Sequence, residues 1–294
     1  MKSKSQKIVS RMDDLFKRLD AVKLAPASVL KSDTQKEHYE SLVMFAYRKY
    51  QAALYHRERI TDLMMARQTE VDEHLTGKMI PDQNTSTMKM TFSRTANEFA
   101  YELSAFFAAL RSSIDFIAKL LVLYSKGNEA DSISNFLKWI EQGKTGPTLD
   151  VVAKHVQWLK HLRDYRDYVV HRLVIGTRAG GQREWKEGKW YEISYPVVVP
   201  SNTPTHIPDT RRARAMADDP DALFDVATFH STLTNPDGSE ISEYKVEVSP
   251  AKGYVKIEEL MDRELKAFER FFIDILTALK KLYFQQAAIL NTQT

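Results

Sequence analysis

The segment from His161 to Arg172 (HLRDYRDYVVHR) holds the side chains best suited to acid–base and anion chemistry. Asp167 and His171 are four positions apart, so on a helix they share one face. A carboxylate in that position orients an imidazole and raises its pKa towards neutrality, where histidine gives and takes protons. Arg166, beside them, has the planar guanidinium that suits phosphate. These residue types predict a site that cleaves phosphodiesters.

Two arginines of the segment continue an apolar helical pattern. The apolar positions of residues 149–159 step by three and four, and in the same phase the next positions are Arg163 and Arg166. A buried guanidinium is costly unless it is paired or meets an anion. Two interpretations stay open: the arginines pair with the neighbouring carboxylates Asp164 and Asp167, or they hold a phosphate.

The spacing of the two central residues bears on oligomeric state. Arg166 and His171 are five positions apart, about 140° around a regular helix, so they do not converge within one straight helix. A two-fold dimer that brings a second copy of the helix across the site would unite them. The predicted site therefore favours a homodimer.

The stretch Arg166-Asp167-Tyr168-Val169-Val170-His171, late in a helix of a mostly helical chain, resembles the Arg-x(4–6)-His motif of the HEPN domain (higher eukaryotes and prokaryotes nucleotide-binding). Ribonuclease members of that family often carry a polar residue after the arginine, as Asp167 stands here. The resemblance covers about residues 95–175 and the C-terminal helix. In a second spacing, Arg67 to His74, the arginine is followed by Gln68, which is only weakly like the asparagine, aspartate or histidine of the motif.

The resemblance implies metal-independent RNA cleavage by a dimer, with no cofactor and with 2′,3′-cyclic phosphate and 5′-hydroxyl ends. It implies that His171 acts as general acid or base, that Arg166 stabilises charge on the scissile phosphate, and that Asp167 holds the imidazole tautomer. The RNA contacts expected on the same segment are Arg163, Arg172 and Tyr168.

Each RNA contact has a structural alternative. Tyr165 and Tyr168 either stack bases or pack inside the bundle, and we favour packing. Arg172 either contacts phosphate or lies in solvent. The three arginines between positions 211 and 214 either grip a nucleic-acid backbone or belong to a solvated loop.

HEPN nucleases often act as toxins or in antiviral defence, which sets the expected biological role by analogy. An antitoxin or another regulatory protein is then a further expected partner. Other members of the family only bind. The alternative function is therefore a non-catalytic helical module for RNA, nucleotide or a partner protein, in which the arginines only form ion pairs.

The composition is that of a folded globular chain. Of 294 residues, 43% are hydrophobic and 28% charged, with a net charge of +3, which excludes a disordered polyelectrolyte. The absence of cysteine excludes disulfides, thiolate metal sites and a cysteine nucleophile. We expect no metal site, because the sequence holds no HExxH or similar ligand set. We expect no membrane contact, because the most apolar stretch, residues 106–124, carries three charges. The N-terminus has no secretion signal, so the expected location is cytoplasmic.

Periodicity predicts a mainly α fold, an antiparallel helical bundle of the HEPN type with a small antiparallel β insertion. Residues 1–94 are expected to form N-terminal helices and a loop, at 77–94, that pack on the core. Residues 95–176 and 254–294 are expected to form the helical core. Residues 177–253 alternate apolar and polar side chains and contain two turn signals, so they are expected to form β-hairpins. The apolar helical stripes lie at residues 8–22, 39–75, 99–124, 149–175 and 257–289, with a short helix at about 132–140.

Overall fold

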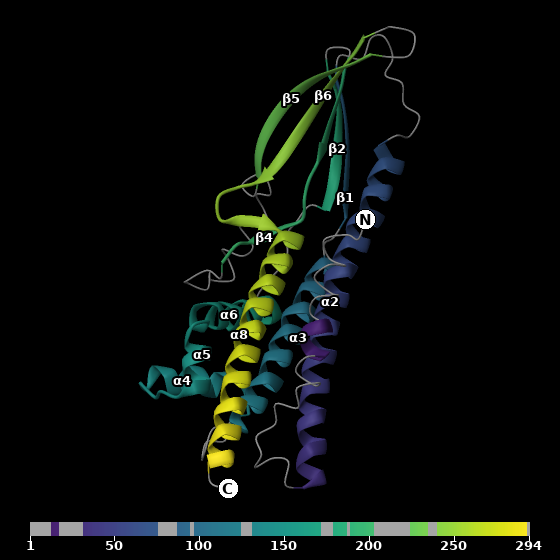
Figure 1. Ribbon diagram of the computed structural model, residues 1–294. Coiled ribbons are helices and arrows are strands. Elements are labelled where there is room, and N and C mark those ends of the chain that lie inside the picture. The colour runs from purple at the N-terminus through teal and green to yellow at the C-terminus, as the bar shows by residue number, and fades with distance from the viewer. Residues whose placement is uncertain are drawn as a thin grey trace. The chain divides into compact units, whose positions relative to one another are not determined.

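Helices make up most of the molecule (Figure 1). The computed structural model describes residues 13–17, 32–75, 87–94, 97–124, 131–171, 179–186, 189–202, 224–234 and 240–292. Its main helices are α2 (Asp33–Leu75), α3 (Asn97–Val122), α4 (Ile133–Glu141), α5 (Pro147–Ala153), α6 (Val156–His171) and α8 (Ile257–Thr292). The mainly α fold is thus confirmed. The expected helix at 8–22 lies outside the described residues except for a helical stretch at 13–17.

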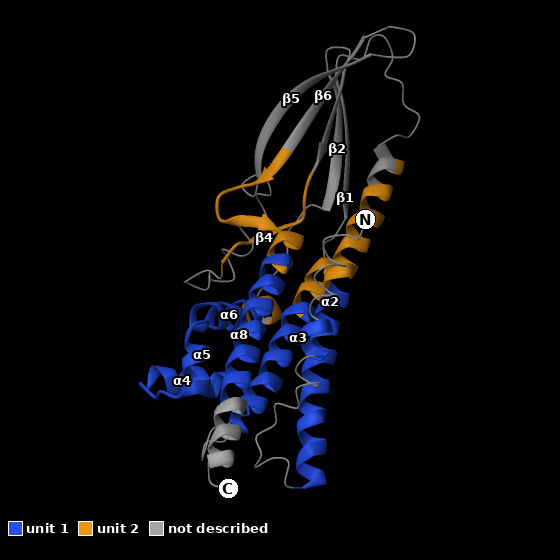
Figure 2. Cartoon of the chain, in the orientation of Figure 1, with its two compact units in different colours: residues 1–56, 105–166, 262–294 blue, residues 57–104, 167–261 orange. Residues whose placement is uncertain are grey.

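The chain forms two compact units, each built from separated segments (Figure 2). The first unit comprises residues 1–56, 105–166 and 262–294, and the second comprises residues 57–104 and 167–261. These boundaries differ from the three segments expected from the sequence. The reason is that α2, α3, α6 and α8 each contribute residues to both units, so the division does not follow the ends of helices.

The core of the first unit lies between α2, α3 and α8, which pack side by side (Figure 2). Tyr50 of α2 stacks on Phe268 of α8, with ring centroids 5.1 Å apart. Ser113 of α3 donates a 2.7 Å hydrogen bond to the carbonyl oxygen of Ala46 on α2. Burying each large aromatic side chain stabilises the fold by about 1.5–3 kcal/mol. The predicted stripe of α3 is buried as expected: Phe99, Leu103, Phe106, Leu110, Ile114, Ile117 and Leu121.

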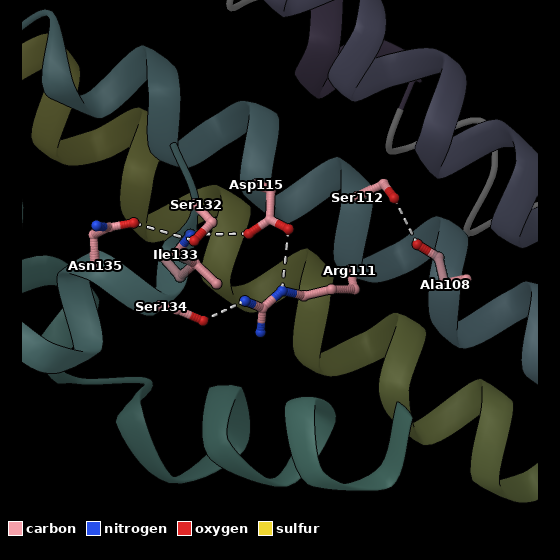
Figure 3. Close-up of polar contacts among 8 residues, drawn as sticks. All are labelled: Ala108, Arg111, Ser112, Asp115, Ser132, Ile133, Ser134 and Asn135. Carbon is pink, nitrogen blue, oxygen red and sulfur yellow. Dashed lines mark hydrogen bonds and ion pairs between the residues drawn. The ribbon is translucent and has the colours of Figure 1, made fainter. Parts of the chain in front are cut away.

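Helix α4 receives its N-terminal cap from another helix (Figure 3). Ser132 occupies the cap position, but its side chain makes no capping hydrogen bond. Instead the backbone N–H of Ile133 donates to Asp115 Oδ1 of α3 at 2.9 Å. Asp115 Oδ2 accepts from Arg111 Nε at 3.2 Å, and Arg111 Nη2 also donates to Ser134 Oγ at 2.7 Å. Arg111 and Asp115, two of the three charged residues of the apolar stretch 106–124, therefore join α3 to the first turn of α4.

A five-stranded sheet belongs to the second unit. Its strands are β1 (Thr87–Arg94), β2 (Ala179–Lys186), β3 (Lys189–Ser194), β6 (Glu240–Pro250) and β5 (Phe224–Thr234), in that spatial order. All neighbours are antiparallel except β3 and β6, which pair in parallel with Tyr191 opposite Tyr244. Both expected hairpins, β2–β3 and β5–β6, are confirmed, although their turn residues lie outside the described part.

The expectation of a loop throughout residues 77–94 is wrong for its second half. Residues 87–94 form β1, which pairs with β2 over its whole length, Met88 lying opposite Trp185. The signal is present in the sequence, because Met88, Met90 and Phe92 alternate with polar residues, the period of a strand. The β structure therefore includes residues 87–94, which precede α3 in the sequence, as well as strands from the 177–253 region.

A small two-stranded sheet completes the second unit. Its strands are β4 (Val198–Pro200) and β7 (Tyr254–Lys256), paired antiparallel with Val198 opposite Lys256. Val198 and Val248 form a small buried cluster there, against which Tyr195 and Tyr254 pack. None of the helices in the described part of the chain has the length and apolar character needed to span a membrane.

Candidate functional site

The end of α6 carries the residues that the sequence selects for chemistry. The helix runs unbroken from Val156 to His171, so Arg166, Asp167 and His171 occupy its last turns. The Arg166 side chain is half-buried and that of Asp167 is exposed. The His171 side chain lies outside the described residues, and so do Arg172 and the arginines between 211 and 214. The carboxylate of Asp167 is thus accessible one helical turn before the histidine.

The predicted phase of the α6 arginines is wrong. The buried positions of the helix are Leu159, Leu162, Tyr165 and Val169. Arg163 and Arg166 flank this stripe and are half-buried, and Val170, the next position in the predicted phase, is 41% exposed. A turn at Lys154 and His155 separates α5 from α6, so the apolar pattern of the first helix does not continue into the second.

The structure describes the surroundings of three further residues of the segment, Arg163, Tyr165 and Tyr168. Arg163 Nε donates to Asp164 Oδ1 at 2.9 Å, and the two side chains are 41% and 48% exposed. Such a surface pair contributes little to stability, about 0–1 kcal/mol. Tyr165 is buried and stacks on Phe107, with centroids 4.8 Å apart, so it has the packing role. Tyr168 is half-buried, and burial, together with the neighbouring Tyr254 phenol, raises its pKa.

A buried carboxylate lies beside the start of this segment. Glu264 of α8 is 1% exposed. Its Oε2 accepts a hydrogen bond from Trp158 Nε1 at 2.8 Å, and its Oε1 accepts one from Arg263 Nε at 3.1 Å. His161 Nε2 lies 3.4 Å from the same Oε1. Burial alone would raise the pKa of Glu264, but the contacts with His161 and Trp158 and the charge of Arg263 together lower it.

The imidazole of His161 has two mutually exclusive partners. Its Nε2 lies 3.3 Å from Arg263 Nη2 as well as near Glu264. A guanidinium only donates hydrogen bonds, so the contact with Arg263 requires an unprotonated Nε2. The contact with Glu264 requires a proton on the same nitrogen. Whether Nε2 carries a hydrogen therefore decides which of the two partners His161 binds.

A second histidine–carboxylate contact joins the same part of the chain to α8. His155 Nε2 lies 2.8 Å from Asp274 Oδ2, and the ring stands edge-on to Phe271 with centroids 5.3 Å apart. Sequence reasoning missed both contacts, because Glu264 and Asp274 lie on a distant helix and no local spacing connects them to the histidines. Among the described residues no group of three or more histidine or acidic side chains is arranged to hold a metal ion.

The second unit contains a buried arginine, Arg67, which is the first residue of the alternative Arg67–His74 spacing. Arg67 of α2 is 7% exposed, and its Nη2 donates to the carbonyl oxygen of Tyr195 at 2.6 Å. Burial lowers the pKa of Arg67 to about 10, and the charge of nearby Glu258 acts in the opposite direction. The guanidinium thus anchors the segment before β4. The side chain of His74, its partner in the alternative spacing, lies outside the described residues.

Compared with known proteins, the chain matches no family model, no curated protein and no solved structure. The interpretation of the site therefore rests on the residue types at positions 161–172 and on the setting of residues 161–171 in α6.

Proposed function

We propose that the protein is a homodimeric, metal-independent endoribonuclease of the HEPN type, with its active site at the C-terminal end of α6. One observation carries the proposal: the Asp167 carboxylate is exposed on a helix that continues unbroken to His171, one turn later. Residues four apart on a helix share one face, where a carboxylate can orient an imidazole for proton transfer. Arg163 and Arg166, half-buried on the same turns, supply positive charge beside it.

The chemistry needs no metal. The ribose 2′-oxygen attacks the adjacent phosphorus, and the bond to the 5′-oxygen of the next nucleotide breaks, which leaves a 2′,3′-cyclic phosphate and a 5′-hydroxyl. His171 either takes the proton from the 2′-hydroxyl as general base or gives one to the departing 5′-oxygen as general acid, and water serves the other of these two proton transfers. Arg166 stabilises the negative charge that develops on the phosphate, and Asp167 fixes the imidazole tautomer. The proposal places this activity in the cytoplasm, in a toxin or antiviral role under an antitoxin or another regulatory protein.

The test is cleavage of a mixed RNA pool by the purified full chain in EDTA. We expect the wild-type protein to give cyclic-phosphate ends and His171→Ala to lose at least about 100-fold in rate, the usual contribution of a general acid or base. His38, an exposed histidine of α2, provides the matched control: His38→Ala should cleave like the wild type. Equal cleavage by His171→Ala and wild type would exclude the proposed site.

A paired comparison tests the orienting carboxylate. Asp167→Asn should slow cleavage, because the amide no longer favours the tautomer that the carboxylate holds. Asp164→Asn changes an exposed aspartate of the same helix that lies beside Arg163, and it should have the smaller effect. A larger loss in Asp164→Asn than in Asp167→Asn would contradict the assignment.

A second candidate function, a non-catalytic module that binds RNA, nucleotide or a partner protein, is favoured by one contact. Arg163 is already paired with Asp164, so part of the positive charge on α6 is neutralised within the chain. A module of this kind would bind labelled RNA without cleaving it, and His171→Ala would bind as tightly as the wild type. Cleavage by the wild type in EDTA would exclude this alternative.

A further inference from the structure

Strand β5 ends the five-stranded sheet, and no strand of the described part covers its outer side. On its inner side all eleven residues pair with β6, from Phe224 opposite Pro250 to Thr234 opposite Glu240. An edge strand of this length presents a row of backbone N–H and C=O groups that are free to pair with another strand. The outer side of β5 is therefore a template for strand addition.

The two edges of the sheet differ in the residues that discourage such pairing. Lysine, other charged side chains and proline are the usual means by which an edge strand is kept from binding another strand. The opposite edge, β1, has eight residues and includes Lys89 and Arg94. Strand β5 is longer and contains no lysine, arginine or proline, and Asp225 is its single acidic residue. Of the two edges, β5 is the one whose sequence permits pairing.

We propose that β5 pairs antiparallel with β5 of a second copy of this chain, about a two-fold axis at Phe229. Each copy contributes five strands, so the product is one continuous ten-stranded sheet. A two-fold contact between identical strands closes on itself, so this interface alone joins two copies. It is a different contact from the one that would bring a second copy of α6 across the proposed site, and it is tested whether or not the chain cleaves RNA.

The sequence of β5 is compatible with pairing to its own copy about that axis. In this register Phe229 is opposite its own copy, Thr228 is opposite His230, and Asp225 is opposite Leu233. Aromatic and β-branched residues at opposed positions favour strand pairing, and like charges at opposed positions disfavour it. No two like charges meet along the eleven residues, because the lone aspartate faces an apolar position. A second copy of the strand is therefore a suitable occupant.

The absence of cysteine allows a direct test by cross-linking. In the full chain Phe229→Cys introduces a single thiol, and the proposed axis places it opposite its own copy. Opposed residues of antiparallel strands have Cα atoms about 4.5–5.5 Å apart, within the range that a disulfide spans. We expect mild oxidation to convert Phe229→Cys into a covalent dimer. Thr234→Cys, at the end of β5, and Phe92→Cys, on β1, should stay at the level of random collision.

Charge substitution supplies the second measurement. Phe229→Lys and Phe229→Glu each place like charges at the axis, so we expect the dissociation constant of each homodimer, measured by sedimentation, to rise at least about tenfold. A mixture of the two variants should dimerise again. If circular dichroism shows that either variant fails to fold, the same swap is made with lysine or glutamate at both Thr228 and His230, on the other face of the strand.

The outcomes separate the alternatives. A wild-type protein that stays monomeric, a cysteine scan of residues 225–233 with no position above the β1 control, or a homodimer that persists in both charge variants would each overturn the β5 pairing. A monomeric wild type would also count against the dimeric part of the proposed function, whereas the other two results leave the RNA-cleavage test at His171 to be decided separately. A cross-link confined to the neighbourhood of residue 229, together with rescue in the mixture, supports the proposed interface.

Discussion

Helix α6 holds histidine and acidic side chains in two very different settings. Near its start, His161 faces a carboxylate, Glu264, that is 1% exposed and bonded to Trp158 and Arg263. Near its end, the Asp167 carboxylate is exposed. Acid–base residue types therefore serve helix packing at one place and remain accessible at the other. Burial, rather than residue type, is what separates a structural contact from a candidate for chemistry.

The largest expected effect is on the free energy of unfolding, when the buried carboxylate of Glu264 is removed. Glu264→Ala removes the acceptor of two hydrogen bonds and leaves Trp158 Nε1 and the Arg263 guanidinium without it. Loss of one partner from a buried charged cluster costs about 3 kcal/mol. We expect the free energy of unfolding, measured in urea, to fall by that amount.

The matched control for Glu264→Ala removes a carboxylate that is exposed on α6. Asp164→Ala removes a largely exposed carboxylate from α6, and it should change the free energy of unfolding by less than about 1 kcal/mol. Equal destabilisation by the two variants would mean that burial does not distinguish the two settings.

A smaller effect is expected in the pH dependence of stability. The pKa of Glu264 in the folded protein is below its ordinary value, so its contribution to stability is fully present above the pKa that it has in the unfolded chain, about 4.3. That contribution is lost as the pH falls through the lower folded-state pKa. Between pH 5 and 3, Glu264→Gln should therefore lose less stability than the wild type, as measured by urea unfolding at each pH. Parallel curves for the two proteins would contradict the assignment.

The smallest effect is expected at Arg163. Its ion pair with Asp164 is solvent-accessible, so Arg163→Ala should lower the free energy of unfolding by no more than about 0.5 kcal/mol. A double-mutant cycle with Asp164→Ala measures the coupling free energy of this pair. We expect that coupling to change little between low and high salt. A coupling above about 2 kcal/mol would show that this end of α6 is as tightly held as the Glu264 cluster.

The helical part of the fold is the part that the sequence predicts best. The apolar stripe of α3 is buried at each turn from Phe99 to Leu121, because a long helix that packs on two neighbours keeps a strict period. Strand β1 was missed, because its alternation is short and uses Met88 and Met90, which also fit an irregular loop. The arginine phase on α6 was wrong, because no residue marks the break between α5 and α6 as a glycine or proline would.

The candidate site is only partly predictable for a different reason. The spacing of Asp167 and His171 on a helix follows from neighbouring residues, and the sequence supplies it directly. The environment of His161 depends on Glu264, which reaches it only when α8 packs against α6. A contact between distant helices leaves no spacing signal in a single sequence. The sequence therefore predicts which residues share a helix face, whereas contacts between distant helices are seen only in the folded structure.

The cap that Asp115 provides to α4 has a consequence for the order of folding. A helix of nine residues is too short to persist alone in water, and here its first amide donates to a carboxylate of α3. We therefore expect α4 to gain its first turn when it docks, after α3 has formed. The amide proton of Ile133 is protected from exchange by that docking, so it reports on the association of the two helices rather than on the fraying of α4 itself.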